Sequence, residues 1–355
     1  MKRIIIVTVL VLVVSGWLYF SGVGEQEQST YTPVSPTIIT PEKPVPADIA
    51  HEMMFIPYWN IPSGEETSEY DSLIYFGVAP DTDGSLKEDE GRSKLELFIE
   101  RSSSARKQYI TVRMLNTETN IEILESPEAQ EKLIREVTEI AQIYRFDGIV
   151  LDLEMSVIPF SDTKEDISDF IEKVSGSLHQ ENLEVLITLY GDTFYRGRPY
   201  DVSFLGEQVD GILIMAYDFH KSRGEPGPNF PFDRKEEYDF KQMVQDFSKN
   251  VDNEKITVIF GMYGYDWTLG EQGLPLKSAQ AIPLYEIESD ILPGCNGDCT
   301  ISTDKTSSET KVTYSDSEGY DHVLWFESED SVEVKMKYLE EQGIGSIGYW
   351  VWGYF

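Results

Sequence analysis

The sequence has few positive charges, few histidines and almost no cysteine. Its 355 residues contain 63 Asp and Glu against 29 Lys and Arg, which gives a net charge of -34. Nucleic-acid binding depends largely on Lys and Arg displacing counterions, so this balance excludes nucleic acid as a partner. The four histidines lack metal-ligand spacing, and no phosphate-binding glycine loop or serine nucleophile elbow is present. We therefore expect neither a metal nor a cofactor.

The only two cysteines are Cys295 and Cys299, which lie in a loop that contains Gly and Asn. Two thiols without further Cys or His nearby are too few ligands for a zinc site. In an oxidising compartment a disulfide across such a small loop is the natural state, so we predict that these cysteines are paired.

Long apolar runs are absent except at the start of the chain. Ile4 to Phe20 are mostly apolar and follow Lys2 and Arg3, which is the layout of an export signal or an uncleaved anchor. Aromatic residues close this run, as they do at a membrane interface, whereas a clear cleavage site is missing. We expect residues 1–24 to be a membrane anchor or a signal peptide. The rest of the chain is then extracytoplasmic, either anchored or secreted.

The next segment, residues 25–50, is rich in Pro, Thr, Ser, Glu and Gln and has few bulky apolar residues. Such a composition cannot offset its own ordering entropy, so we predict a disordered tether. Residues 51–355 have the composition of an ordinary globular domain and are numerous enough to bury roughly three quarters of their unfolded surface.

In this domain, short β-rich apolar runs alternate with helical patterns, which is typical of an α/β fold with a parallel sheet. Eight such runs over about 300 residues predict a (β/α)8 TIM barrel. The predicted strands are Met53 to Tyr58, Ser72 to Val78, Gln108 to Met114, Gly148 to Leu153, Glu184 to Tyr190, Gly211 to Tyr217, Lys255 to Met262 and Ser346 to Trp350.

The intervening helices carry apolar residues at helical spacing, so each should pack on the outside of the barrel. One of them is predicted to start at Ser126, with Pro127 in its first position. The apolar positions are Leu133, Val137, Ile140, Ala141 and Tyr144 in this helix, Ile167, Phe170, Ile171, Val174 and Leu178 in the next, and Val332, Met336 and Leu339 before Gly343.

The stretch from Tyr263 to about Trp325 is too long for one connection. Its Gly, Ser, Asp and Thr content, together with Val312, Tyr314 and Val323, predicts a β-hairpin inserted between the seventh and eighth strands. An insertion after a barrel strand falls on the active-site face of a TIM barrel.

The chemistry is expected in the fourth predicted strand. Side chains alternate along a strand, so Val150, Asp152 and Glu154 share one face, which we expect to point into the barrel lumen. Two carboxylates there are costly to desolvate, and their repulsion should raise the proton affinity of at least one, as a general acid requires. In the alternative interpretation, Glu154 ends the strand in water and Asp152 caps a turn.

The residues from Asp147 to Glu154 resemble the fourth-strand motif of glycoside hydrolase family 18, Asp-Gly-x-Asp-x-Asp-x-Glu. Asp147, Gly148, Asp152 and Glu154 match, whereas Val150 stands where the middle Asp belongs. That Asp can accept a proton or a hydrogen bond from the next one, which a valine cannot do. We interpret the change as tuning, because relatives of the spore type commonly depart here too.

The resemblance continues along the chain. Met215 to Asp218 is similar to the family's Met-x-Tyr-Asp at the end of strand six, and Gly264 to Trp267 is similar to the segment after strand seven. The closing segment 348–353, with 322–327 before it, is similar to the branch that contains bacterial spore-germination and cortex-lytic enzymes.

The resemblance implies retaining, substrate-assisted hydrolysis of β-glycosidic bonds beside N-acetylglucosamine in peptidoglycan, cortex or chitin-like polymers. This family is an exception to the scheme with two catalytic carboxylates, since the substrate supplies the nucleophile. Glu154 would protonate the glycosidic oxygen, Asp152 would orient the attacking 2-acetamido group, and Tyr217 would hydrogen-bond its oxygen. The substrate-binding residues implied are Asp218, Trp350 and Asp147.

Other interpretations remain open from the sequence. Tyr217 and Trp350 could instead fill the barrel interior, as aromatic residues in such strands often do. The chain could also be a catalytically silent glycan-binding protein on the same barrel, which Val150 favours, or an envelope scaffold, which the anchor and tether favour. Residues that could line a sugar cleft, outside the catalytic set, are Tyr58, Trp59, Asn116 and Trp267.

Overall fold

The computed structural model describes residues 48–63, 66–102, 106–155, 161–234, 237–295 and 299–355. These all belong to the unit Pro44–Phe355. The predicted anchor or signal peptide, 1–24, and nearly all of the predicted tether, 25–50, lie outside the described residues, so both stay predictions. Within the described ranges, no helix combines the length and the apolar character that a membrane span requires.

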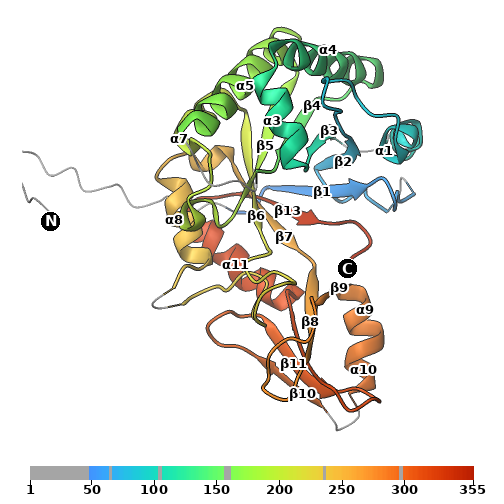
Figure 1. Cartoon of the computed structure of the whole chain (residues 1–355), viewed down its shortest axis with the longest axis vertical. Helices are drawn as coiled ribbons and strands as arrows, with labels where there is room; N and C mark the ends of the chain where they lie inside the picture. The colour runs from blue at the N-terminus through green and yellow to red at the C-terminus, as the bar shows by residue number, and fades with distance from the viewer. Residues whose placement is uncertain (1–47, 64–65, 103–105, 156–160, 235–236, 296–298) are drawn as a thin grey trace, which may run out of the picture. The chain divides into compact units, whose positions relative to one another are not determined.

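Eight parallel strands close into a barrel in the order β1-β13-β7-β6-β5-β4-β3-β2 (Figure 1). The eight strands coincide with the predicted ones to within two residues at either end, which confirms the predicted (β/α)8 fold. They are β1 (His51–Pro57), β2 (Ser72–Val78), β3 (Lys107–Met114), β4 (Gly148–Leu153), β5 (Glu184–Tyr190), β6 (Gly211–Ala216), β7 (Ile256–Gly261) and β13 (Ser346–Trp350).

The long helices pack on the outside of this barrel, as their apolar spacing predicts. α4 (Pro127–Tyr144) begins where expected, because the Ser126 side chain accepts a hydrogen bond from the N–H of Ala129 at 3.2 Å. α11 (Glu329–Glu341) ends just before Gly343, whose φ of 79° suits glycine. The remaining helices are α1 (Glu90–Ser93), α2 (Leu95–Arg101), α3 (Thr117–Glu125), α5 (Ser161–Gln180), α6 (Thr193–Arg196), α7 (Val202–Gln208), α8 (Phe240–Ser248), α9 (Leu284–Glu286) and α10 (Leu292–Gly294), with short 3₁₀ and π turns at Asn253–Lys255 and Ile287–Ile291.

The insertion between β7 and β13 is larger than the predicted hairpin. It is a five-stranded antiparallel sheet in the order β10-β11-β12-β8-β9, and Figure 1 shows it beyond the end of β7. The predicted disulfide joins Cys295, after α10, to Cys299 at the start of β10. The five strands are β8 (Tyr263–Leu269), β9 (Gln280–Pro283), β10 (Cys299–Thr303), β11 (Thr310–Ser315) and β12 (Asp321–Phe326).

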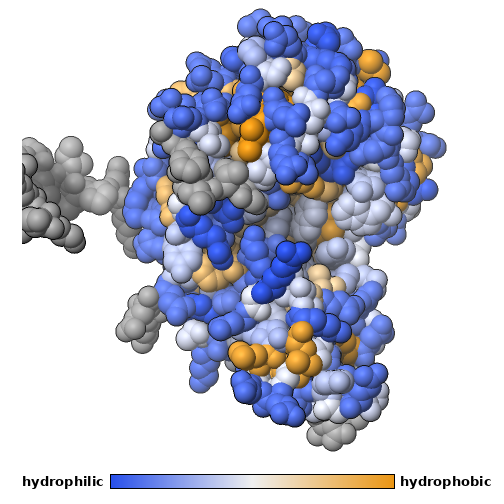
Figure 2. Space-filling view, viewed as in Figure 1, coloured by the Kyte–Doolittle hydropathy of each residue, from blue (hydrophilic) through white to orange (hydrophobic). Residues whose placement is uncertain are grey.

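Among the described residues, two apolar clusters form the core: a large one between the barrel and its helices, which extends into the insertion, and a small one inside the lumen. Along β4, Ile149, Leu151 and Leu153 belong to the outer cluster, whereas Val150 belongs to the inner one. The predicted alternation is therefore confirmed, and Asp152 shares the inward face of Val150. Over most of the face seen in Figure 2 the residues are hydrophilic, with apolar residues in small groups.

Candidate active site

Asp152 lies near the carboxyl end of β4, buried with 5% of its surface exposed. Its carboxylate accepts a hydrogen bond from the hydroxyl of Thr188 on the neighbouring strand β5. Burial, and after it the negative charge of Glu154, raises the pKa of Asp152 to about 7, although Thr188 and Arg113 act in the opposite direction. The raised proton affinity predicted for at least one of the two carboxyls is thus found at Asp152.

Glu154 follows β4 directly and is half-buried. Its N–H donates to the carbonyl of Met114 on β3 at 2.9 Å, and its own carbonyl accepts from the Asn120 amide at 3.0 Å. Its carboxylate accepts a hydrogen bond from the Tyr190 hydroxyl at 2.7 Å. These contacts fix both backbone and side chain, so Glu154 does not simply end the strand in water.

Tyr217 and Trp350 lie at the ends of β6 and β13, with ring centroids 6.4 Å apart and planes 26° from parallel. Phe55 and Phe76 contact the Trp350 ring at 5.5 and 4.8 Å between centroids. Burial, and after it the charges of Asp152 and other nearby carboxylates, raises the pKa of Tyr217 well above 10. Its hydroxyl therefore stays a hydrogen-bond donor at neutral pH.

Asp218 follows Tyr217 in the left-handed backbone region, with φ of 58°. Its carboxylate accepts hydrogen bonds from the hydroxyls of Tyr263 and Tyr265, the latter at 2.8 Å, and both tyrosines belong to β8. Its N–H donates to the side-chain oxygen of Asn229 at 2.8 Å. The inserted sheet thus holds one of the predicted substrate-binding residues in place.

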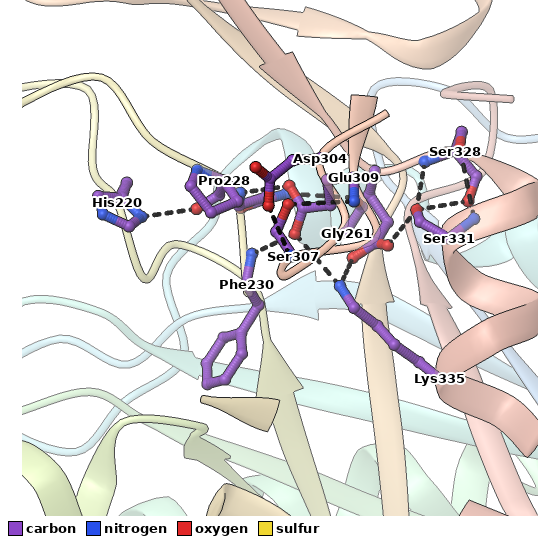
Figure 3. Close-up of polar contacts among 12 residues, drawn as sticks. His220, Pro228, Phe230, Gly261, Asp304, Ser307, Glu309, Ser328, Ser331 and Lys335 are labelled. Carbon is purple, nitrogen blue, oxygen red and sulfur yellow. Dashed lines mark hydrogen bonds and ion pairs between the residues drawn. The ribbon is translucent and has the colours of Figure 1, made fainter. Parts of the chain in front are cut away.

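A buried group of charges, of which Figure 3 labels Glu309 and Lys335, supports Asn229 in turn. The N–H groups of Asn229 and Phe230 donate to the Glu309 carboxylate at 2.5 and 2.7 Å. Glu309 also accepts from the Lys335 ammonium at 3.2 Å, and Lys335 pairs with Glu327. Because Glu309 precedes β11 and Lys335 lies on α11, this network connects the insertion and the last helix to the loop that carries Asp218.

Asp147 is not brought to this site. It precedes β4, at the opposite end of the strand from Glu154, and the six residues of β4 separate the two by roughly 20 Å. The exposed Asp147 carboxylate accepts from the N–H of Gln108 at 2.7 Å, which aligns the starts of β3 and β4. The substrate-binding role predicted for Asp147 is therefore replaced by a structural one.

The four residues proposed to line a cleft fall in different environments. Tyr58 and Trp59 follow β1 in edge contact with each other, and Trp59 is 45% exposed, 6.0 Å from the ring of Phe76. Asn116 caps α3 and lines a cavity of about 230 Å³. Trp267 is wholly buried inside the insertion and donates to the carbonyl of Gly224, so it does not line a cleft.

Three residues of the site were missed in the sequence. Thr188 and Tyr190 lie on β5 with their side chains towards Asp152 and Glu154. Arg113, opposite Asp152 in the strand register, donates to Asp89 at 2.6 Å and to the carbonyl of Gly77 at 2.9 Å. Side chains alternate between the two faces of a strand, and this alternation puts all three polar residues on the inward faces of β3 and β5. It is the sequence pattern that could have revealed them.

Comparison with known proteins adds independent evidence. The model of the family described as glycosyl hydrolases family 18 matches residues 52–354, which is most of the chain. The "Cortical fragment-lytic enzyme" of Bacillus anthracis is 27% identical over 295 residues, which cover 78% of this chain. A "Putative sporulation-specific glycosylase YdhD" from Bacillus subtilis is 25% identical and covers 66% of it.

These matches span 64% and 54% of the two relatives' own lengths, so both relatives contain further sequence that this chain does not match. Among solved structures, the spore cortex-lytic enzyme SleL of Bacillus cereus superposes with a TM-score of 0.73. The two are 24% identical, and the alignment covers 88% of this chain and 72% of the other. This likeness independently supports the barrel fold.

Proposed function

Since the chain belongs to glycosyl hydrolases family 18, we propose that it hydrolyses β-glycosidic bonds beside N-acetylglucosamine in peptidoglycan, cortex or chitin-like polymers. The observation that carries this proposal is the pair of carboxyls at the end of β4. Asp152 is buried with a pKa of about 7, and Glu154 is fixed by a hydrogen bond from Tyr190. The names of the relatives, a cortical fragment-lytic enzyme and a glycosylase, support this substrate class.

In the proposed mechanism Glu154 donates its proton to the glycosidic oxygen as the bond to the anomeric carbon breaks. The carbonyl oxygen of the substrate's own 2-acetamido group attacks that carbon, so the protein supplies no nucleophile and the configuration is retained. Asp152 accepts a hydrogen bond from the acetamido N–H, which orients the group and stabilises the positive charge that develops on it. Glu154, now a carboxylate, then activates the water that opens the cyclic intermediate.

The aromatic and acidic residues around the pair would bind the sugar. The Tyr217 hydroxyl, which stays protonated, donates to the acetamido oxygen, and Asp218 accepts from sugar hydroxyls. Trp350 presents a face suited to the C–H groups of a pyranose and rests on Phe55 and Phe76.

The N-terminal predictions complete this proposal. An anchor or signal peptide in residues 1–24 and a tether in 25–50 would place the catalytic domain, 51–355, outside the cytoplasm. That is where peptidoglycan and cortex are located. The partners proposed are therefore an N-acetylated glycan and, through the first segment, a membrane.

The substitution Glu154→Gln tests this function directly. It removes the transferable proton while keeping the size of the side chain, so release of reducing ends should fall about a thousandfold. The full-length protein and the variant are incubated with peptidoglycan and with chitin oligomers, and the products are identified by mass. Glu172→Gln, at an exposed position on α5, is the matched control and should keep full activity. Undiminished turnover by Glu154→Gln would overturn the proposal.

Val150 favours a second candidate, a glycan-binding protein without catalytic activity. The valine removes the partner that would let Asp152 reorient between steps of the reaction. Binding of chitin oligomers without any product at several pH values would support this candidate, whereas product release would exclude it.

A further inference from the structure

The hydroxyl of Tyr190 contacts the carboxylate of Glu154. It donates to one carboxylate oxygen, Oε2, at 2.7 Å. Burial, and after it the charge of Glu154, raises the pKa of Tyr190 above its usual range, so the phenol keeps its proton. Because Oε2 already accepts the hydrogen bond from Tyr190, it acts as the carbonyl oxygen when Glu154 is protonated. The proton of the acid is then carried by the other oxygen, Oε1.

A cationic side chain packs against the ring of Tyr190. The guanidinium of Arg198 lies 3.5 Å from the ring centroid, where it stacks on the aromatic face. Its Nε donates to the carboxylate of Asp192 at 2.6 Å, and the side chains of Arg198 and Asp192 are only 11% and 5% exposed. Arg196 also pairs with Asp192, so this carboxylate is neutralised from two sides.

The same segment of chain also holds the backbone around Glu154. Tyr200 donates its hydroxyl hydrogen to the carbonyl of Leu153 at 2.7 Å and accepts from the N–H of Met155 at 3.1 Å. Residues 190–200 therefore contact Glu154 through its side chain and through both neighbouring peptide groups. A solvent-exposed strand end would need none of these contacts.

We propose that Tyr190, fixed by Arg198 and Asp192, is a positioning residue for the acid: it selects which oxygen of Glu154 carries the proton and stabilises the carboxylate left after proton transfer. This inference rests on the proposed function and adds a residue to it. The O–H bond of Glu154 breaks as an O–H bond forms on the leaving oxygen, which takes the electron pair of its bond to the anomeric carbon. A hydrogen bond to a charged acceptor is stronger than one to a neutral acceptor, so the Tyr190 contact strengthens as the reaction proceeds.

Leaving-group dependence provides the test. The full-length protein is assayed on a chitin oligomer, whose sugar leaving group needs a proton, and on a dinitrophenyl N-acetylglucosaminide, whose leaving group does not. Tyr190→Phe should lower kcat on the oligomer roughly 10- to 100-fold, the effect expected of one hydrogen bond to a charged group. On the dinitrophenyl substrate kcat should change by less than about threefold, and KM should stay nearly constant on both. Arg198→Met should show the same selective loss to a smaller degree.

Two comparisons separate this role from a merely structural one. Tyr195→Phe, in the same segment but with an exposed side chain, should behave as wild type on both substrates. Tyr200→Phe, which removes the backbone contacts, should lower both activities alike. An equal loss on both substrates for Tyr190→Phe, or no loss on either, would overturn the inference.

Failure of the proposed function would look different. Glu154→Gln should lose activity on the oligomer but still release dinitrophenolate in the first step, which needs no acid, while later turnovers slow because the carboxylate that activates water is gone. A Glu154→Gln variant that kept both activities would contradict the function itself, whatever Tyr190→Phe does.

Discussion

Val150 distinguishes this site from the family motif, and its surroundings explain why a valine suits it. It is fully buried in the lumen cluster, among apolar residues that include Phe55, Leu186 and Leu213. A carboxylate in that cluster would lie against mainly apolar side chains, which favour its neutral form. The lumen below Asp152 is therefore built for an apolar side chain.

Substitution of Val150 by Asp should destabilise the protein. We expect the free energy of unfolding at pH 7 to fall by about 4 kcal/mol, which corresponds to a carboxyl whose pKa burial raises by about three units. A raised pKa favours the neutral form in the folded state, so the loss should be larger at pH 8 than at pH 5. Urea unfolding at the two pH values measures it.

Val150→Thr is the control, since it keeps the shape and adds no charge. A Val150→Asp variant as stable as wild type and more active would show that the lumen accepts a third carboxylate. In that case, valine in place of the family's middle Asp would lower the activity rather than adjust it.

The sequence predicted the central pair of residues but not their partners. Alternation along β4 was enough to put Asp152 and Glu154 on the inward face, because that rule depends only on neighbours in sequence. Tyr190 lies 36 residues from Glu154, and no local pattern connects the two. Asp147 shows the converse error, because membership of a motif does not put a residue at the same end of the strand.

At the scale of elements, the Glu309, Lys335 and Glu327 network is the least expected feature. All three side chains are fully buried. Burial foremost, then the charge of Glu309, raises the pKa of Glu327 to about 7, against the opposing effect of Lys335. Burial opposes the charge on Lys335, yet the two carboxylates raise its pKa above 10.5. One cation therefore faces one carboxylate and one carboxyl that ionises near neutrality.

Two substitutions in this network should change the stability of the protein in different ways. Lys335→Met leaves two buried carboxylates without a cation and should cost about 3–5 kcal/mol of stability at pH 7. The folded state raises the pKa of Glu327, so the stability this group contributes is complete below about pH 4.5 and is lost as the pH rises through about 7. Glu327→Gln mimics the neutral form and should flatten the decline in stability between pH 5 and pH 8.

Thermal unfolding at pH 5 and pH 8 compares the two variants with wild type. Lys337→Met, at an exposed position on the same helix, is the matched control and should change little. Equal pH dependence in wild type and Glu327→Gln would show that Glu327 does not titrate in this range.

The barrel elements were predictable because each strand carries its own apolar run and each long helix its own stripe. The inserted sheet was not, for physical reasons. β8 follows β7 after a single residue, Met262, so no turn marks its start. β9 has four residues and β10 is mostly exposed, so neither has the apolar pattern of a core strand.

For the whole molecule, the sequence predicted the fold class and the family, and the structure and the family match confirm both. The hydrophilic face in Figure 2 agrees with the net charge of -34. We propose that the substrate, and not the protein, supplies the nucleophile. Neither strand alternation nor residue spacing could establish this, because half of the chemistry belongs to the sugar.

The most direct measurement compares two aryl β-glycosides that differ only at carbon 2, one with an acetamido group and one with a hydroxyl. Both carry the same leaving group, and kcat/KM is measured for the full-length protein. We predict cleavage of the acetamido substrate and at least a roughly thousandfold lower value for the hydroxyl analogue, which lacks the intramolecular nucleophile. Comparable values for the two would contradict the account, because they would require a nucleophile from the protein.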